Sequence, residues 1–301
     1  MLAVSAVVCT HNRRDSLTRT LRSLAAQTLA VTEYEILVVD NGSTDGTRAA
    51  LERAGDDITN LRCVDEPRVG LSRARNTGWQ AARGAVVAYL DDDATAASQW
   101  LACIVAAFRT ITPRPGCVAG KIVPIWDAPR PAWLADALVP CLSILDWGDR
   151  ARPLRPEEWI AGCNMAFPRD VLADSGGFRT DLGRCGDDLV SMEEVALRRA
   201  VEARGYTTYY DPAIEVRHHI AAARLQQRWF RRRMYWNGVS AARARGPHSW
   251  RETARAASRL VAPRAWADVL VAGADPARFA RACVWLGRVG YLRGALQAGG
   301  R

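Results

Sequence analysis

The 301-residue sequence has no run of about 18 apolar residues, so it predicts no membrane-spanning helix. None of its eight cysteines forms a C-x-x-C pair, which argues against a zinc site and for reduced, mostly buried thiols. The opening residues, MLAVSAVVCTHNRR, lack the basic start and long apolar core of a signal peptide. These absences predict a cytoplasmic protein, and peripheral contact with the inner face of the membrane stays open.

The chain also has no internal repeat and no low-complexity tract, and its composition is that of a globular protein. It is 49% hydrophobic and 24% charged, which allows one large domain or one domain with a helical appendage. The formal net charge of +9 predicts anionic partners, namely nucleic acid, phosphorylated small molecules or anionic lipid.

Strand and helix patterns alternate over residues 1–112. Near-continuous apolar runs predict buried strands, and apolar residues at helical spacing predict helices. The expected strands cover 3–9, 35–39, 61–64 and 85–90. The expected helices cover 15–27, 45–53 and 71–82, and Asp45 is expected to be the N-cap of the second of these helices. This order indicates an α/β fold with a parallel sheet covered on both faces.

Polar clusters follow three of the expected strands. They are CTHNR at 9–13, DNGSTDG at 40–46 and DDD at 91–93. Because ligands bind beyond the carboxyl ends of the strands in such sheets, the three clusters are expected to converge on one crevice.

The pattern changes after residue 112, where prolines and tryptophans become frequent and short strands and loops are expected. The expected elements are helices at 168–175 and 188–204, strands at 207–210 and 214–218, and C-terminal helices with breaks near Gly246–Pro247, Pro263 and Pro276. We therefore predict one domain over 1–221, with halves 1–112 and 113–221, followed by a helical region over 222–301.

Three consecutive aspartates, Asp91, Asp92 and Asp93, follow the strand expected at 85–90. Unpaired carboxylates this close raise one another's pKa and destabilise a fold. A divalent cation removes that cost, and oxygen ligands suit Mg²⁺ or Mn²⁺. The alternative is a solvated acidic turn that caps a helix.

Four segments of the first half resemble, in order and spacing, the family 2 glycosyltransferases. They are VVCTHNR at 7–13, VVDNGSTDGT at 38–47, RVGLSRARNTGWQAARG at 68–84 and YLDDDA at 89–94. Further matches, GCNMAFPRDVLADSGGF at 162–178 and EEVALR at 193–198, extend the resemblance over about residues 3–220. The resemblance implies the GT-A fold, a Rossmann-like nucleotide-diphospho-sugar transferase fold. It also implies transfer of a sugar from a nucleotide diphosphate sugar with inversion at the anomeric carbon.

The resemblance implies a metal site at the aspartates. Asp93 would be the direct ligand of Mn²⁺ or Mg²⁺, and Asp91 would face the ribose or the metal's water shell. His218, rather than His219, would contact the diphosphate or the metal, although it could also be structural or exposed. The metal would stabilise the departing diphosphate.

The donor pocket implied by the resemblance draws on all three strand ends. Thr10, Arg13 and Asp40 would line the base pocket, Gly70 would allow close backbone approach, and Arg73 would lie near the base or phosphates. Surface charge is the alternative for the two arginines. The full donor-binding set is Thr10, Arg13, Asp40, Gly70, Arg73, Asp91, Asp92 and His218.

An acidic pair, Glu193–Glu194, matches the place where the family has its general base. An inverting transfer needs a carboxylate to deprotonate the attacking hydroxyl. Glu194 matches the base position, with Glu193 as the second choice. Favourable charge at a helix N-terminus is the alternative for both.

Aromatic residues among arginines mark the second half. The helix expected at 228–245, with Trp229, Arg233 and Trp236 on one face, would pack on the catalytic domain, contact diphosphate or an acidic acceptor, or lie on a membrane. Trp266, Phe279, Trp285, Leu286 and Leu292 keep the membrane option open. Trp126, Trp133, Trp147 and Trp159 would stack on acceptor sugars or pack in the core.

The sequence thus predicts a metal-dependent inverting glycosyltransferase. Its partners would be a nucleotide diphosphate sugar, with uridine as the default base, and a hydroxyl of a glycan, lipid-linked or natural-product acceptor. The alternatives are a sugar nucleotidyltransferase, which should show a Gly-rich N-terminal loop with a following lysine, and a non-enzymatic basic nucleic-acid-binding protein.

Overall fold

A computed structural model describes residues 2–246, 248–258, 260 and 275–298. The expectations for Pro247, Pro263 and Trp266 lie outside these residues. The chain divides into two compact units. Unit 1 comprises Met1–Ile125, Ile144–Thr180 and Glu194–His219, and unit 2 comprises Trp126–Ser143, Asp181–Glu193 and Ile220–Arg301. The domain boundary near residue 221 stays a prediction.

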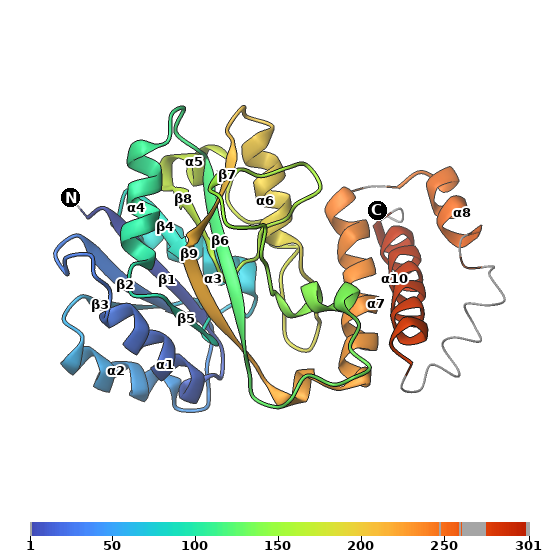
Figure 1. The fold of residues 1–301 in the computed structure, drawn as a ribbon, viewed down its shortest axis with the longest axis horizontal. Coiled ribbons are helices and arrows are strands. Elements are labelled where there is room, and N and C mark those ends of the chain that lie inside the picture. The colour runs from blue at the N-terminus through green and yellow to red at the C-terminus, as the bar shows by residue number, and fades with distance from the viewer. Residues whose placement is uncertain (1, 247, 259, 261–274, 299–301) are drawn as a thin grey trace. The chain divides into compact units, whose positions relative to one another are not determined.

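Unit 1 is built on one mixed β-sheet, in the order β3-β2-β1-β4-β8-β6-β9-β5, with β7 paired to β9 (Figure 1). The first four strands run parallel, as the apolar runs predict, and β8 pairs antiparallel with β4 and β6. The strands are β1 (Val4–Thr10), β2 (Tyr34–Asp40), β3 (Leu61–Asp65), β4 (Val86–Tyr89), β5 (Ala94–Ala96), β6 (Cys117–Trp126), β7 (Arg152–Pro153), β8 (Met165–Pro168) and β9 (Thr208–Ile220).

Helices cover both faces of this sheet (Figure 1). Val4, Ala6 and Val8 of β1 belong to one apolar cluster and Val7 to the other, because successive strand residues point to opposite faces. The first cluster includes residues of α1 (Arg14–Ala25), α2 (Thr47–Asp57) and α4 (Trp100–Thr110), and the second includes residues of α3 (Leu71–Ala81), α5 (Arg169–Asp174) and α6 (Glu193–Glu202). The predicted α/β architecture is confirmed.

Three local predictions are wrong. The N-cap of α2 is Gly46, at φ +86°, rather than Asp45, whose carboxylate instead accepts the amide N–H of Thr47. Helix α6 begins at Glu193 instead of 188, because Met192 has a positive φ of 73° that no right-handed helix allows. The two strands expected at 207–218 form the single strand β9, in which Pro212 lies between the pairings with β7 and β5.

Unit 2 contains η1 (Asp136–Leu142), η2 (Ala222–Arg224), α7 (Gln227–Arg245), α8 (Trp250–Ser258) and α10 (Pro276–Ala298). Helices α7 and α10 touch backbone to backbone, since a Cβ on Gly238 would lie 1.8 Å from the Gly287 carbonyl oxygen. Trp133 packs edge-on against Phe279, with ring centroids 5.0 Å apart. Phe279 and Trp285 are buried, so these two rings serve the interior of the unit and form no exposed apolar face. None of the described helices is both long and apolar enough to cross a membrane.

Candidate active site

The carboxyl ends of β1 and β2 and the turn after β4 meet, as the sequence predicts. Thr10 and Asp40 are paired residues at the ends of β1 and β2. The Thr10 hydroxyl donates a hydrogen bond to the Asp92 carboxylate over 2.8 Å. Parallel strands bring these residues together because their ends lie at one edge of the sheet.

Hydrogen bonds to main-chain carbonyl oxygens hold the aspartate turn between β4 and β5. Thr20, fully buried on α1, donates to the carbonyl oxygens of Asp92, at 3.1 Å, and Ala94, at 2.7 Å. The amide N–H of His219 donates to the Asp93 carbonyl oxygen over 2.9 Å. Ala94 is paired with His218 across β5 and β9, which brings the end of β9 to the aspartates.

Asp93 and His218 form a buried carboxylate–imidazole pair, with 3.3 Å between Oδ1 and Nε2. Their exposed fractions are 9% and 2%. Carboxylate oxygen and imidazole nitrogen are donors that suit Mn²⁺, so the side chains present fit the predicted metal. Within the described ranges no group of three or more His, Cys, Asp or Glu side chains could hold a metal ion.

Asp92 shows the electrostatic cost of the cluster. Burial, and then the charge of Asp93, raise the pKa of the Asp92 carboxyl to about 7. The hydrogen bond from Thr10 and the positive charge of Arg13 act in the opposite direction. The turn therefore concentrates negative charge that a bound cation would neutralise.

Asp91 is paired with Arg75, a residue that the sequence analysis missed. The guanidinium Nη2 lies 3.1 Å from Asp91 Oδ1, and Arg75 is only 2% exposed. Its cationic carbon lies 5.6 Å from the centroid of Phe178 and 6.0 Å from that of Tyr89. Helical spacing could have found it, because Arg75 lies beside Ala74 and three residues before Gly78 on the buried face of α3. The role of Asp91 at the ribose or metal stays a prediction.

The loop after β2 is closed by Asn41, a second residue that the sequence analysis missed. Asn41 accepts the amide N–H of Gly70 at 2.7 Å and donates to the carbonyl oxygens of Glu66 and Arg68. Asp40 accepts the amide N–H of Ser43 over 3.0 Å. These bonds join the second polar cluster to the loop before α3. The signal was its position beside Asp40 in the second polar cluster.

The remaining predicted donor residues lie around these loops. Gly70 adopts φ +151°, a conformation that favours glycine, and a Cβ there would lie 3.6 Å from the Arg73 side chain. Arg73 is half-buried on α3, and Arg13 is exposed at the N-cap of α1. Their contacts with a nucleotide stay predictions.

The acidic pair stands at the first turn of α6, where the helix dipole favours negative charge. Glu193 is 4% exposed and Glu194 is half-buried. Glu194 belongs to unit 1 with the aspartates, whereas Glu193 belongs to unit 2. In unit 2 the Ser191 amide donates to the buried Ser240 hydroxyl at 3.0 Å, which holds the segment before the pair. Which glutamate is the base stays a prediction.

Tryptophans expected near an acceptor pack inside their own units. Trp147 and Trp159 contact edge to face at 6.3 Å, beside a core cluster that includes Ile122 and Tyr210. Trp133 packs on Phe279 in unit 2. These contacts favour core packing for Trp133, Trp147 and Trp159. The side chains of Trp147 and Trp159 are half-buried.

Comparison with known proteins identifies the family. The family model described as "Glycosyl transferase family 2" matches residues 5–174 of this chain. The glucosyl-dolichyl phosphate glucuronosyltransferase of Haloferax volcanii is 33% identical over 79% of this chain and 76% of its own length. The validoxylamine A glucosyltransferase of Streptomyces hygroscopicus subsp. jinggangensis is 30% identical over 62% of this chain and 49% of its own length.

Solved structures agree on the fold. The mannosyltransferase PcManGT from Pyrobaculum calidifontis, in complex with GDP-Man and Mn²⁺, matches with a TM-score of 0.63 and 21% identity over 97% of this chain and 86% of its own. TarS 1–349 of S. aureus, in complex with UDP, matches with a TM-score of 0.56 and 16% identity over 98% and 89%. These neighbours are glycosyltransferases with the GT-A fold.

The family match decides among the three functions that the sequence left open. A nucleotidyltransferase and a nucleic-acid-binding protein lose their support, because the named relatives are glycosyltransferases. The chain is a glycosyltransferase enzyme that belongs to glycosyl transferase family 2.

Proposed function

We propose that this chain is a metal-dependent inverting glycosyltransferase that takes its sugar from a nucleotide diphosphate sugar, with UDP as the default nucleotide. The observation that carries the proposal is the meeting of Thr10, Asp92, Asp93 and His218 at one edge of the sheet. The buried Asp93 carboxylate and His218 imidazole lie beside the Asp92 carboxyl, whose pKa is raised. A cation bound here, together with the anion that it brings, would offset this accumulation of negative charge.

Asp93 and His218 would hold the metal, together with oxygens of the donor's diphosphate. Asp91 would complete the predicted metal site by facing the metal's water shell or the ribose, and its ion pair with Arg75 supports this indirect role. When bound, the metal would supply Lewis-acid stabilisation of the negative charge on the departing diphosphate. The Mn²⁺ in the mannosyltransferase complex supports this choice of ion.

The nucleotide would lie across the ends of β1 and β2. Thr10 and Asp40 end these strands, and Asn41 holds the Gly70 loop next to them. Arg13 and Arg73 would supply positive charge toward the phosphates or base. The neighbours in complex with GDP-Man and UDP support a nucleotide ligand, and both bases are to be tested.

Glu194 would act as the general base, with Glu193 as the alternative. Its carboxylate would accept the proton of the acceptor hydroxyl as the oxygen attacks the anomeric carbon. The bond from that carbon to the diphosphate oxygen breaks in the same displacement, so the configuration inverts. The half-buried place of Glu194 in the first turn of α6 would hold its carboxylate in position.

The acceptor is proposed to be a hydroxyl of a lipid-linked glycan, another glycan or a small natural product. One relative is named for a dolichyl phosphate substrate and another for validoxylamine A. Helices α7 and α10 carry arginines and no acidic residue, which would suit a cytoplasmic enzyme that touches anionic lipid at the membrane surface.

A binding screen followed by product analysis tests the proposal. Nucleotide sugars with uridine, thymidine and guanosine bases are compared by thermal shift with Mn²⁺ and with chelator, since a ligand of the native state raises its Tm. The best donor is then incubated with acceptor glycosides, and NMR reads the anomeric configuration of the product. Retention of configuration, or equal thermal shifts with metal and chelator, would contradict the proposal.

A further inference from the structure

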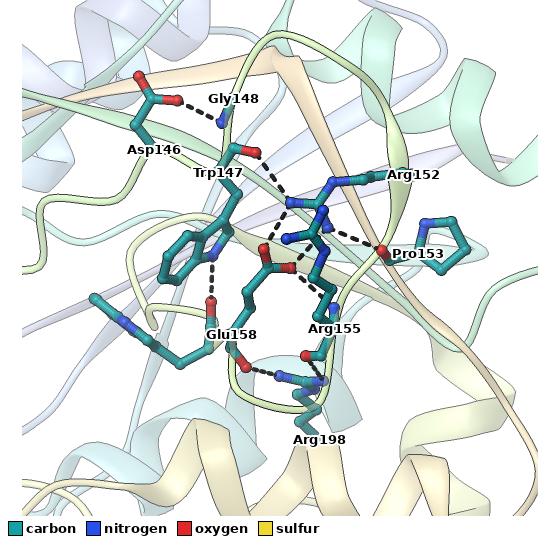
Figure 2. Close-up of polar contacts among 9 residues, drawn as sticks. Asp146, Trp147, Gly148, Arg152, Pro153, Arg155, Glu158 and Arg198 are labelled. Atoms are coloured by element: carbon teal, nitrogen blue, oxygen red, sulfur yellow. Dashed lines mark hydrogen bonds and ion pairs between the residues drawn. The ribbon is translucent and has the colours of Figure 1, made fainter.

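Two buried arginines lie against the two ends of the segment 155–162, and Figure 2 shows the first of them, Arg198. Arg198, on α6, contacts residues 155 and 158. Arg75, which pairs with Asp91, lies against Gly162, where a Cβ would be 2.3 Å from the guanidinium. All these residues belong to unit 1. The segment therefore runs from the helix of the proposed base to the aspartate turn.

Arg198 uses its guanidinium on main-chain oxygens rather than on an open surface. It donates to the carbonyl oxygen of Glu158 and, over 3.3 Å, to that of Arg155. Its Nε donates to the Glu202 carboxylate at 2.6 Å. The residue is 7% exposed, so these bonds are formed largely out of water, where a lost partner is costly.

The loop that Arg198 contacts is itself rigidly closed. Glu158, 7% exposed, receives two hydrogen bonds from the Arg152 guanidinium, at 2.7 and 2.6 Å, and one from the Arg155 amide at 2.9 Å. Arg152 also donates to the Trp147 carbonyl oxygen over 3.0 Å (Figure 2). A bidentate pair of this kind, with a buried carboxylate and a half-buried arginine, fixes geometry as well as energy.

The position of Arg198 on α6 links this loop to the proposed base. Arg198 follows Glu194 by four residues, so the two side chains leave the same side of the helix. Arg199, the next residue, is exposed. The rigid loop therefore fixes the rotation of α6 about its own axis and the position of α6 along that axis.

We infer that Arg198 is a positioning residue for the transfer reaction: it holds α6 against the closed loop 147–158 so that Glu194 faces the reacting hydroxyl. This inference rests on the proposed function. Arg198 acts through the helix and contacts no substrate. Misplacing a reacting group by about 1 Å can cost on the order of 100-fold in rate.

The test compares Arg198→Met and Arg198→Lys with Arg199→Met, an exposed control on the same helix. The probe is hydrolysis of the nucleotide sugar that gives the largest thermal shift, with water in place of the acceptor. We expect Arg198→Met to lower kcat about 10- to 100-fold while the KM for donor and the calorimetric Kd for UDP change less than about threefold. Arg198→Lys should recover part of kcat, and Arg199→Met should match the unchanged protein.

A second pair separates positioning from folding. Glu158→Gln weakens the loop support and should lower kcat by a smaller factor, whereas the exposed neighbour Glu157→Gln should leave it unchanged. An unchanged kcat in Arg198→Met, or a loss that only follows the folded fraction measured by Tm, overturns the inference. Glu194→Gln distinguishes the levels: normal hydrolysis by this variant overturns the proposed base, whereas an inactive Glu194→Gln beside a normal Arg198→Met overturns the positioning role alone.

Discussion

The aspartate turn and the loop beside α6 are held by different kinds of contact. At the turn, short hydroxyl side chains act beside one arginine: Thr10 reaches Asp92, Thr20 reaches two carbonyl oxygens, and Arg75 pairs with Asp91. At the loop, long arginine side chains bridge segments far apart in sequence, as Arg198 does across 40 residues to Glu158. Strands β1 and β4 are paired and lie about 4.8 Å apart, so the Thr10 hydroxyl can reach the turn after β4; a loop has no such register and needs a longer bridge.

The largest effect is expected on the α6 side, where a substitution should strongly slow catalysis and leave binding at the aspartate turn unchanged. Glu194→Gln removes the proposed base and should lower kcat about 100- to 10,000-fold. The thermal shift with UDP and Mn²⁺ should stay as large as in the unchanged protein, because the donor site is intact. If Glu193→Gln is the inactive variant instead, the base moves to the adjacent residue.

Asp93→Asn tests the donor side and should show the opposite pattern in binding. Loss of a charged partner for the metal should lower kcat about 100- to 1,000-fold and abolish the additional thermal shift that Mn²⁺ gives with UDP. Titration calorimetry of Mn²⁺ in the presence of UDP checks this directly. An unchanged metal response would remove Asp93 from the site.

Arg75→Met sharpens the comparison, because Arg75 is the buried arginine that supports the aspartate turn. Its removal leaves the Asp91 carboxylate without its partner and should lower the free energy of unfolding by about 2 kcal/mol. Urea denaturation measures the change, with exposed Arg19→Met on α1 as control. Equal stability of the two variants would show that the pair is dispensable.

The smallest effect concerns the loop before α3. Hydrogen bonds from Arg68, and then from Thr77, lower the pKa of Glu66 from 4.5 to about 2. Its folded pKa is depressed, so its stabilisation is full above pH about 4.5 and is lost as the pH falls toward about 2. Glu66→Gln should remove this contribution, about 1 kcal/mol, and flatten the pH dependence of unfolding across that window. A wild-type slope in the variant would assign the dependence to other carboxylates.

Much of the proposed donor site could be predicted from sequence, for a local reason. Strand and helix periods are set by neighbouring residues, and the parallel order then brings Thr10, Asp40 and the aspartates to one edge. The structure brings His218 within 3.3 Å of Asp93, whereas its contact with the diphosphate or the metal, which the resemblance implies, stays a prediction. Local patterns put Asn41 beside Asp40 and Arg75 on the buried face of α3, but their partners Gly70 and Asp91 lie in other segments, and only the structure shows these pairings.

The sequence by itself determined the α/β architecture, the family and the edge of the sheet where polar residues gather, because each follows from local patterns and their order. Only the tertiary structure decided that Asp91 belongs to Arg75, that Met192 delays the start of α6, and that Arg198 fastens this helix to a closed loop. These outcomes depend on distances between segments far apart in the chain, and burial makes each of those contacts hard to replace with water.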